Sequence, residues 1–220
     1  MTVVPKRRVG RPPKRVLSRD IIFEAGLKLL DERGAHGSGM RDIARELGVQ
    51  PSALYNHVAG QDDVIAGVRE LIGDRIDGAM FDELPWDEAL VVWAHSYRDA
   101  FAAHPPTIAL LAVTPVLPDS RISLMYEKVL TALEQGGWPV DQLLSVMVAL
   151  ESFILGSALD AVADDEILNP GDRVDVPLYT AAHAARRTAI AGRRPADVAF
   201  EVGLDVIISG LRARLAALSR

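Results

Sequence analysis

The chain contains no cysteine among its 220 residues. This absence excludes disulfide bonds and cysteine-ligated zinc or iron–sulfur centres, and it agrees with a reducing cytosol. The chain also lacks a run of about 18 uninterrupted apolar residues, which a membrane-spanning helix needs. The most apolar stretch, residues 140–163, is interrupted by acidic residues, a glutamine and serines. The N-terminus lacks the apolar segment of a signal peptide. We therefore expect a soluble, cytoplasmic protein with no membrane partner.

Alternating strand patterns and Asn-Gly or Asp-Gly hairpin turns are also missing, whereas apolar residues recur every three to four positions. This periodicity predicts an all-α fold. The sequence has no nucleophile elbow, zinc-protease motif, phosphate-binding loop or dinucleotide-binding glycine pattern. His95, His104 and His183 form no recognisable metal-ligand spacing. The chain is therefore expected to be no enzyme and to carry neither cofactor nor metal.

The first nineteen residues lack acidic side chains entirely and hold seven of the 24 Lys and Arg residues. The other 201 residues carry 17 basic and 30 acidic side chains. Closely spaced cations neutralise phosphates and release counterions, so this arm, residues 1–17, is expected to be disordered and to bind nucleic acid. The alternative is a solvated tail without a partner.

Behind the arm, the sequence predicts a helix over residues 18–33, with Ser18 as its N-cap and Gly34 as its stop. A short helix over 40–47 and another over 51–58 flank Gly48-Val49-Gln50, and a fourth helix follows Gly60. Two short helices joined by a glycine turn are typical of a helix-turn-helix, whose second helix enters the DNA major groove. An ordinary helical hairpin has the same spacing and stays open as an alternative.

The rest of the chain predicts further helices, over residues 86–104, 120–135, 140–163, about 178–191 and 196–218. We expect three segments: the disordered arm at 1–17, a three-helix helix-turn-helix DNA-binding domain at 18–75, and a helical ligand-binding and dimerisation domain at 76–220. No internal repeat is evident.

The motif at residues 38–58 resembles the tetracycline-repressor (TetR) family of transcriptional regulators. The resemblance rests on Ile43-Ala44, Gly48-Val49 and Leu54-Tyr55-Asn56-His57-Val58, spaced as in that family. It implies that Arg41 contacts a base or a phosphate and that Tyr55 and His57 lie near phosphates. It also implies base-edge contacts from Pro51, Ser52, Ala53 and Tyr55. Small residues at the start of the second helix would permit close approach to the bases.

Two positions depart from the family pattern. Where the family usually has a threonine that caps the second helix, this chain has Gly39, which has no side-chain oxygen. Where the family commonly has a lysine that contacts a phosphate, this chain has Gln61. The arm offers a compensation, because Gly10-Arg11-Pro12-Pro13-Lys14-Arg15 resembles an AT-hook. Its match is partial, since Val9 stands where an arginine is usual. Arg11, Lys14 and Arg15 are thus predicted to bind DNA, by insertion into an A·T minor groove or by diffuse phosphate attraction. An arm with no DNA role is the third reading.

Aromatic residues recur at helical spacing along residues 86–104. Such a stripe indicates either core packing or the wall of a ligand cavity. Glu151 interrupts an apolar helix and either reaches solvent or an arginine at the helix edge, or serves a function. The candidate ligand-binding residues are Trp93, Tyr97, Phe101, His104, Met125, Met147 and Glu151. The resemblance implies that an inducer entering this core shifts the fourth helix. Tetracycline is not the expected inducer, because residues 62–77 lack the histidine that its receptors use.

The last helix offers an apolar stripe with two glycines one heptad apart, which would allow a close helix contact. The resemblance implies a homodimer built from two helices of each chain, and a palindromic DNA site also requires two-fold symmetry. Packing within one chain is the alternative for each residue. The candidate dimer residues are Gly156, Gly203, Ile207, Gly210 and Leu211.

Together these features predict a ligand-responsive transcriptional regulator, a repressor that a small-molecule inducer releases from a palindromic operator in double-stranded DNA. An architectural protein that coats A·T-rich DNA through its arm is the alternative.

Overall fold

The computed structural model describes residues 17–34 and 39–218, and within them every regular element is a helix. This confirms the all-α prediction. The elements are α1 (Arg19–Arg33), α2 (Met40–Leu47), α3 (Pro51–Leu54), α4 (Gln61–Gly73), α5 (Trp86–Ala102), α6 (Ile108–Leu111), α7 (Arg121–Gln135), α8 (Val140–Asp160), α9 (Pro177–Ala189) and α10 (Pro195–Leu218), with short 3₁₀ turns η2 (Ala79–Asp82) and η3 (Pro105–Thr107).

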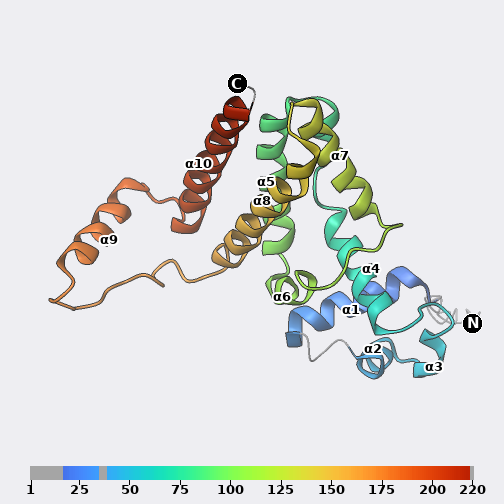
Figure 1. Cartoon of the computed structure of the whole chain (residues 1–220). Coiled ribbons are helices and arrows are strands. Elements are labelled where there is room, and N and C mark those ends of the chain that lie inside the picture. Colours follow the sequence, from blue (N-terminus) through green and yellow to red (C-terminus); the bar gives the residue numbers. More distant parts are fainter. Residues whose placement is uncertain (1–16, 35–38, 219–220) are drawn as a thin grey trace, which may run out of the picture.

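Helices α1 to α4 gather at one end of the molecule (Figure 1). Helix α1 begins where Ser18 caps it, its Oγ accepting a hydrogen bond from the Ile21 amide at 3.4 Å. The faces of α1 and α4 meet so closely that a Cβ on Gly67 would overlap the Phe23 ring. Ile22 and Val68 are fully buried between these helices. A tight apolar core therefore fixes the frame that carries α2 and α3.

Gly48 makes the turn between α2 and α3. Its backbone is left-handed, with φ 64° and ψ 32°, and the following Val49 amide bonds back to the Ala44 carbonyl at 2.9 Å. A side chain in this conformation places its Cβ against the next carbonyl oxygen. The glycine predicted to allow the turn is thus required by its geometry, while Gly39 caps α2 without a side-chain hydrogen bond.

Gly48→Ala is expected to destabilise the protein by about 1–2 kcal/mol through backbone strain. The melting temperature should fall by about 2–4 °C for each kcal/mol in a chain of this size. Gly60→Ala is the matched control, because Gly60 has extended φ (163°) and a Cβ placed on it would have nothing within 4 Å. Equal melting temperatures for Gly48→Ala and the wild type would show that the turn carries no strain.

The second helix of the motif is shorter than expected. The sequence predicted residues 51–58, but α3 ends at Leu54. The amides of His57 and Val58 both bond to the Leu54 carbonyl, at 2.8 and 3.0 Å, so the chain tightens into a turn. Leu54 and Val58 are buried, and they pull this turn onto the core.

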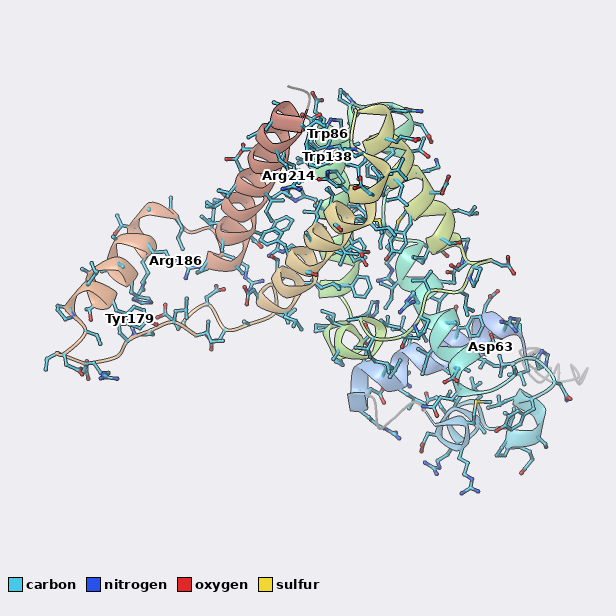
Figure 2. The ribbon with its side chains drawn as sticks, viewed as in Figure 1. Asp63, Trp86, Trp138, Tyr179, Arg186 and Arg214 are labelled. Carbon is cyan, nitrogen blue, oxygen red and sulfur yellow. The ribbon has the colours of Figure 1, made fainter. Side chains whose placement is uncertain are left out.

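The body of the molecule consists of α5 to α8 and α10 (Figure 1). Helices α5 and α8 pack along one another, and Trp93, Leu150 and Ile154 are fully buried in this region. At the far end Trp86 meets Trp138 edge to face, with ring centroids 5.9 Å apart (Figure 2). The body helices begin and end within a few residues of the predicted boundaries, except that α8 ends at Asp160 instead of residue 163.

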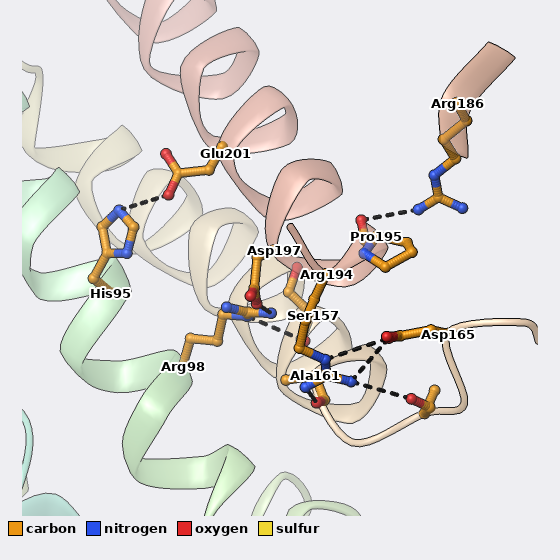
Figure 3. A network of polar contacts seen from close by, with 11 residues as sticks. His95, Arg98, Ser157, Ala161, Asp165, Arg186, Arg194, Pro195, Asp197 and Glu201 are labelled. Carbon is orange, nitrogen blue, oxygen red and sulfur yellow. Dashed lines mark hydrogen bonds and ion pairs between the residues drawn. The ribbon is translucent and has the colours of Figure 1, made fainter. Parts of the chain in front are cut away.

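Arginines hold α10 and the preceding connection to the body (Figure 3). Arg98 of α5 is buried, donates to the Ser157 carbonyl at 3.3 Å and pairs with Asp197 at 2.8 Å. Arg194 donates to the Ala161 carbonyl and to Asp165. In contrast, α9 lies apart from the bundle, and none of its residues is buried (Figure 1).

Helix α8 is, in the described part of the chain, the one helix long and apolar enough to cross a membrane. The packing of α8 within the protein gives another reason for its apolar composition. One side lies against α5 and α7, while Leu144, Val148 and Leu159 on the helix remain about half or more exposed. Helix α8 is therefore a core helix with a second apolar face.

Helix α4 connects the N-terminal helices to the body. Near its end, Arg75 donates to His104 Nε2 at 3.0 Å, and His104 Nδ1 lies 2.8 Å from Asp31 of α1. Arg121 at the start of α7 bonds to Glu70 at 3.1 Å and to Asp74 at 2.9 Å. A displacement of α4 would therefore disturb both parts of the molecule.

Candidate functional site

Helices α2 and α3, which carry most of the residues predicted to contact DNA, lie next to each other at one end of the molecule (Figure 1). Arg41, Ser52 and Tyr55 are exposed, whereas Pro51, Ala53 and His57 are half-buried. Tyr55 leaves 56% of its surface exposed. Because Leu54 and Val58 anchor the segment from below, its outer side chains are held at the surface. None of these six residues is buried, and their contacts with DNA remain predictions.

Arg19 ties the start of α1 to the end of this surface. Its Nη1 donates to the His57 carbonyl at 2.9 Å, and its Nη2 lies 2.6 Å from Asp63 (Figure 2). Asp63 also accepts the Ala59 amide at 2.9 Å. Partial burial of Asp63 opposes ionisation, but the hydrogen bonds from Arg19 and Ala59 outweigh it and lower the pKa of this carboxyl. The chain therefore enters α1 beside the predicted DNA-reading surface. The arm residues Arg11, Lys14 and Arg15 lie outside the described residues.

The helix-turn-helix region has an unfavourable charge for DNA binding. Residues 18–75 contain seven Lys and Arg but ten Asp and Glu. Several of these cations are already paired, Lys28 with Glu46 and Arg45 with Asp42. Arg41 has no ion-pair partner within the described ranges. Residues 1–17 add six cations and no acid. This charge balance favours the prediction that the arm binds phosphates, which stays a prediction.

A cavity of about 390 Å³, open to the surface beside Leu144 and Val148, lies among α4, α5, α7, α8 and the chain after α6. Its wall is mainly apolar, including Phe101, Ile122 and Met147, and the Tyr97 ring stacks on Phe101 with centroids 5.1 Å apart. A few polar side chains interrupt it, as is usual for small-molecule sites. They are Arg69, Tyr97, Thr114, Tyr126, Glu151 and Ser152.

Two phenols converge on one carboxyl oxygen in this cavity. The hydroxyls of Tyr97 and Tyr126 both donate to Glu151 Oε1, the first at 3.0 Å. Burial raises the pKa of Glu151, against the opposing effects of the two phenols and of Arg69. Burial and the neighbouring Glu151 raise the pKa of both tyrosines. Both phenols therefore remain protonated near neutral pH.

Arg69 of α4 brings a guanidinium to the same cavity. The residue is only 9% exposed, and its Nη2 donates to the carbonyls of Leu111, at the end of α6, and Thr114. No carboxylate lies within 4 Å of it in the described part of the chain. Arg69 also lines a second hollow of about 330 Å³ that faces Arg19 and Phe23. This residue therefore stands between the cavity and the N-terminal helices.

Four of the seven predicted ligand residues line the cavity, namely Tyr97, Phe101, Met147 and Glu151. The other three lie elsewhere. Trp93 is fully buried and packs edge-on against Phe81 and Tyr97, so it belongs to the core. His104 joins α5 to Asp31 and Arg75, and Met125 lines a separate groove between α4 and α7. Sequence reasoning missed Arg69 and Tyr126, although the Arg69-Glu70 pair of charges within the apolar part of its helix was a usable signal for Arg69.

Glu151→Gln is expected to change the pH dependence of stability. A carboxyl whose pKa is raised on folding favours the folded state at low pH, and this contribution is lost as the pH rises through its folded-state pKa. Glutamine does not titrate, so the variant should gain melting temperature relative to the wild type as the pH increases from about 4 towards neutral. Thermal melts over a pH series would measure this, with the exposed Glu127→Gln as control. A constant difference between Glu151→Gln and the wild type at every pH would contradict it.

Two models of one protein family match the chain. The family model described as "Tetracyclin repressor-like, C-terminal domain" matches residues 82–215, and that described as "Bacterial regulatory proteins, tetR family" matches residues 22–66. The first match alone covers more than half of the chain. The chain belongs to the TetR family. It is therefore a DNA-binding transcriptional regulator of the helix-turn-helix type, as its sequence predicted.

Similar TetR-family proteins span nearly the whole chain. The HTH-type transcriptional repressor DrrR1 of Streptomyces coeruleorubidus is 27% identical, over 96% of this chain and 83% of its own. The tetracycline repressor protein class E of Escherichia coli is 28% identical, over 90% and 92%. The crystal structure of the TetR-family protein ActR of Streptomyces coelicolor, in complex with actinorhodin, has 23% identity and a TM-score of 0.69, over 90% and 98%. This last likeness concerns the fold.

The TetR-family resemblance also predicted a dimer surface, and the structure divides its candidate residues into two groups. Gly156 and Gly210 are exposed, and nothing lies within 4 Å of a Cβ placed there. Gly203 instead faces its own chain, because a Cβ there would lie 2.5 Å from the Phe153 ring. Ile207 and Leu211 are half-buried against the chain's own core. The close approach at Gly203 thus serves packing of α10 on α8 within one protomer.

Proposed function

We propose that this TetR-family protein is a cytoplasmic, homodimeric repressor that a small-molecule inducer releases from a palindromic operator. The observation that carries the proposal is the cavity that reaches α4 through Arg69. Helix α4 packs on α1 through Val64 and Val68 and also bonds to α6 and α7. A ligand in the cavity would therefore act on the helix that positions the DNA-binding surface.

The ligand is proposed to be an oxygenated aromatic compound. Two observations support this class. Tyr97 and Phe101 offer stacked aromatic faces, and the phenols of Tyr97 and Tyr126 with Glu151 offer hydrogen bonds at one end. Relatives of the same fold have been crystallised with actinorhodin and with minocycline. A purely architectural role would leave such a cavity without use, so the coating of A·T-rich DNA is not favoured.

The dimer is proposed to form through the outward apolar faces of α8 and α10. Three large side chains that a monomer would expose, and that do not line the cavity, lie on these two helices: Leu159, Val202 and Val206. Gly156 and Gly210 lie among the exposed residues of the same helices and would let two helices approach closely. An exposed apolar area of this kind is typical of a protein interface.

The arm is proposed to add contacts outside the major groove. The Arg19–His57 bond places the start of α1 next to the DNA-reading surface. An extended segment advances about 3.1 Å per residue, so Arg11 can extend about 20 Å from Ser18. That reach is sufficient to cross a phosphate backbone to the neighbouring minor groove.

A cavity-filling variant tests the proposal. Ala112 lines the cavity, whereas its neighbour Val113 does not and is 80% exposed. DNA upstream of the chain's own gene is bound to the protein, and a panel of aromatic compounds is screened for release by fluorescence anisotropy. Ala112→Trp is expected to bind the DNA but to resist release, while Val113→Trp should respond like the wild type. Equal release of both variants, or no release of the wild type by any compound, would contradict a ligand-controlled repressor.

A further inference from the structure

Arg69 carries a buried positive charge that has no ion-pair partner among the described residues. The residue is 9% exposed, and the partners given by the described residues are two backbone carbonyls, which are neutral. Both bonds come from one guanidinium nitrogen, Nη2. The Nε and Nη1 groups are thereby left for another acceptor. A buried charge is costly without a counter-charge, so the site favours an anion beside it.

Glu151 is the acidic residue that lines the same cavity, but its hydrogen bonds go to two tyrosines and not to Arg69. No ion pair joins it to Arg69 in the part of the chain that the structure describes. Its Oε1 already accepts the phenols of Tyr97 and Tyr126. Burial raises the pKa of Glu151, with Arg69 as the weakest of the opposing influences. The cavity thus contains one guanidinium and one carboxyl that form no ion pair with each other within the described residues.

We propose that the cavity selects ligands with an acidic oxygen, a carboxylate or an ionised phenol, and that Arg69 binds that oxygen through Nε and Nη1. This inference rests on the proposed function, because it names the ligand class of the same cavity. A guanidinium presents a planar fork of donors that matches a carboxylate. The apolar wall and the Tyr97–Phe101 stack would hold the remainder of an aromatic acid.

The contact between Arg69 and the ligand would also explain how ligand binding changes the position of the DNA-binding helices. Arg69 holds the end of α6 through Leu111 and the following chain through Thr114. An anionic oxygen competes with these neutral carbonyls for the guanidinium, since charge-assisted hydrogen bonds are the stronger ones. Rotation of Arg69 towards the ligand would release α6 from α4. A movement of α4 would also reach α7, because the neighbouring Glu70 forms an ion pair with Arg121 of α7.

Three related compounds test the charge preference without any mutation. They are an anthraquinone carboxylic acid without hydroxyl groups, its primary carboxamide and its aminoethyl amide, which are anionic, neutral and cationic near neutral pH. Isothermal titration of the full-length dimer should show the acid binding about 10- to 100-fold more tightly than the carboxamide. The cation should bind most weakly. A carboxamide or cation that binds as tightly as the acid would overturn the inference.

Variants then assign the preference to Arg69. Arg69→Met should abolish the preference for the acid, and Arg69→Lys should retain part of it. Arg75→Met is the matched control, because Arg75 follows α4 outside the cavity and contacts His104. Arg69→Lys keeps the charge, so it also serves if Arg69→Met does not fold. Retention of the full preference in a folded Arg69→Met dimer would overturn the assignment.

The inference and the proposed function fail in different ways. If the cation binds best and Glu151→Gln abolishes its binding, the acidic-ligand inference is wrong while a ligand-controlled cavity remains. If none of the three compounds binds a folded, DNA-competent dimer, the inference also fails. The compound screen with Ala112→Trp and Val113→Trp then decides separately whether the cavity controls DNA binding.

Discussion

Deletion of residues 1–17 is expected to reduce operator affinity by about 100-fold or more near physiological salt. The reason is charge. The deletion removes six cations, whereas residues 18–75 carry seven basic and ten acidic side chains. The slope of log K against log salt should flatten by up to about 5, because each neutralised phosphate contributes about 0.9. Fluorescence anisotropy with operator DNA over a salt series measures both effects.

Lys28→Gln is the control for a general loss of charge, since Lys28 is an α1 cation paired with Glu46. A second pair of variants distinguishes how the arm binds. Minor-groove insertion predicts that Arg11→Ala weakens binding more than Arg8→Ala, and more on A·T than on G·C flanking sequences. Diffuse attraction predicts equal losses. A truncated protein with an unchanged salt slope would show that the arm has no role on DNA.

Val206→Glu is expected to separate the dimer and to abolish tight operator binding. Val206 lies on α10 and is 63% exposed in the single chain, so a glutamate there leaves the protomer folded. In a dimer the carboxylate would be buried without a partner, which costs several kcal/mol. A monomer contacts one half-site only, and we expect at least about a 100-fold loss of operator affinity. Analytical ultracentrifugation and anisotropy measure the two effects.

Leu124→Glu is the matched control, because Leu124 is 68% exposed on α7, away from the proposed interface. This variant should remain dimeric and bind DNA normally. Melting curves check that both variants are folded. A Val206→Glu protein that sediments as a dimer and binds its operator with wild-type affinity would refute the α8–α10 interface.

Local features of the fold could be predicted from the sequence because they depend on neighbouring residues. Ser18 accepts the Ile21 amide at the start of α1, and Gly48 adopts the left-handed turn, as their residue types indicated. The prolines after residue 104 end α5. The length of α3 was wrong because the burial of Leu54 and Val58, a tertiary effect, bends the chain early.

The cavity could be predicted only in part. Helical spacing placed Trp93, Tyr97 and Phe101 on one face of α5, but the periodicity of one helix does not reveal what the face meets. Trp93 meets Phe81, whereas Tyr97 meets the cavity. Tyr126 and Arg69 reach it from helices distant in the sequence. Their convergence on Glu151 and on the end of α6 requires the tertiary structure.

The two faces of α10 show a similar limit. Phe200, Leu204 and Ile208 are buried in the protomer, whereas Val202 and Val206 point outward. The buried residues and the exposed residues both follow helical spacing, so the sequence alone did not distinguish the core face of α10 from its exposed face. This explains why Gly203, a predicted dimer residue, packs on Phe153 of its own chain.

The most direct test of the whole account is a DNase footprint of the purified protein on the promoter of its own gene, with and without a compound that occupies the cavity. We predict one protected palindrome, which disappears when the compound binds while the protein stays dimeric. Uniform coating of A·T-rich DNA, or a footprint that persists with the cavity occupied, would contradict the account.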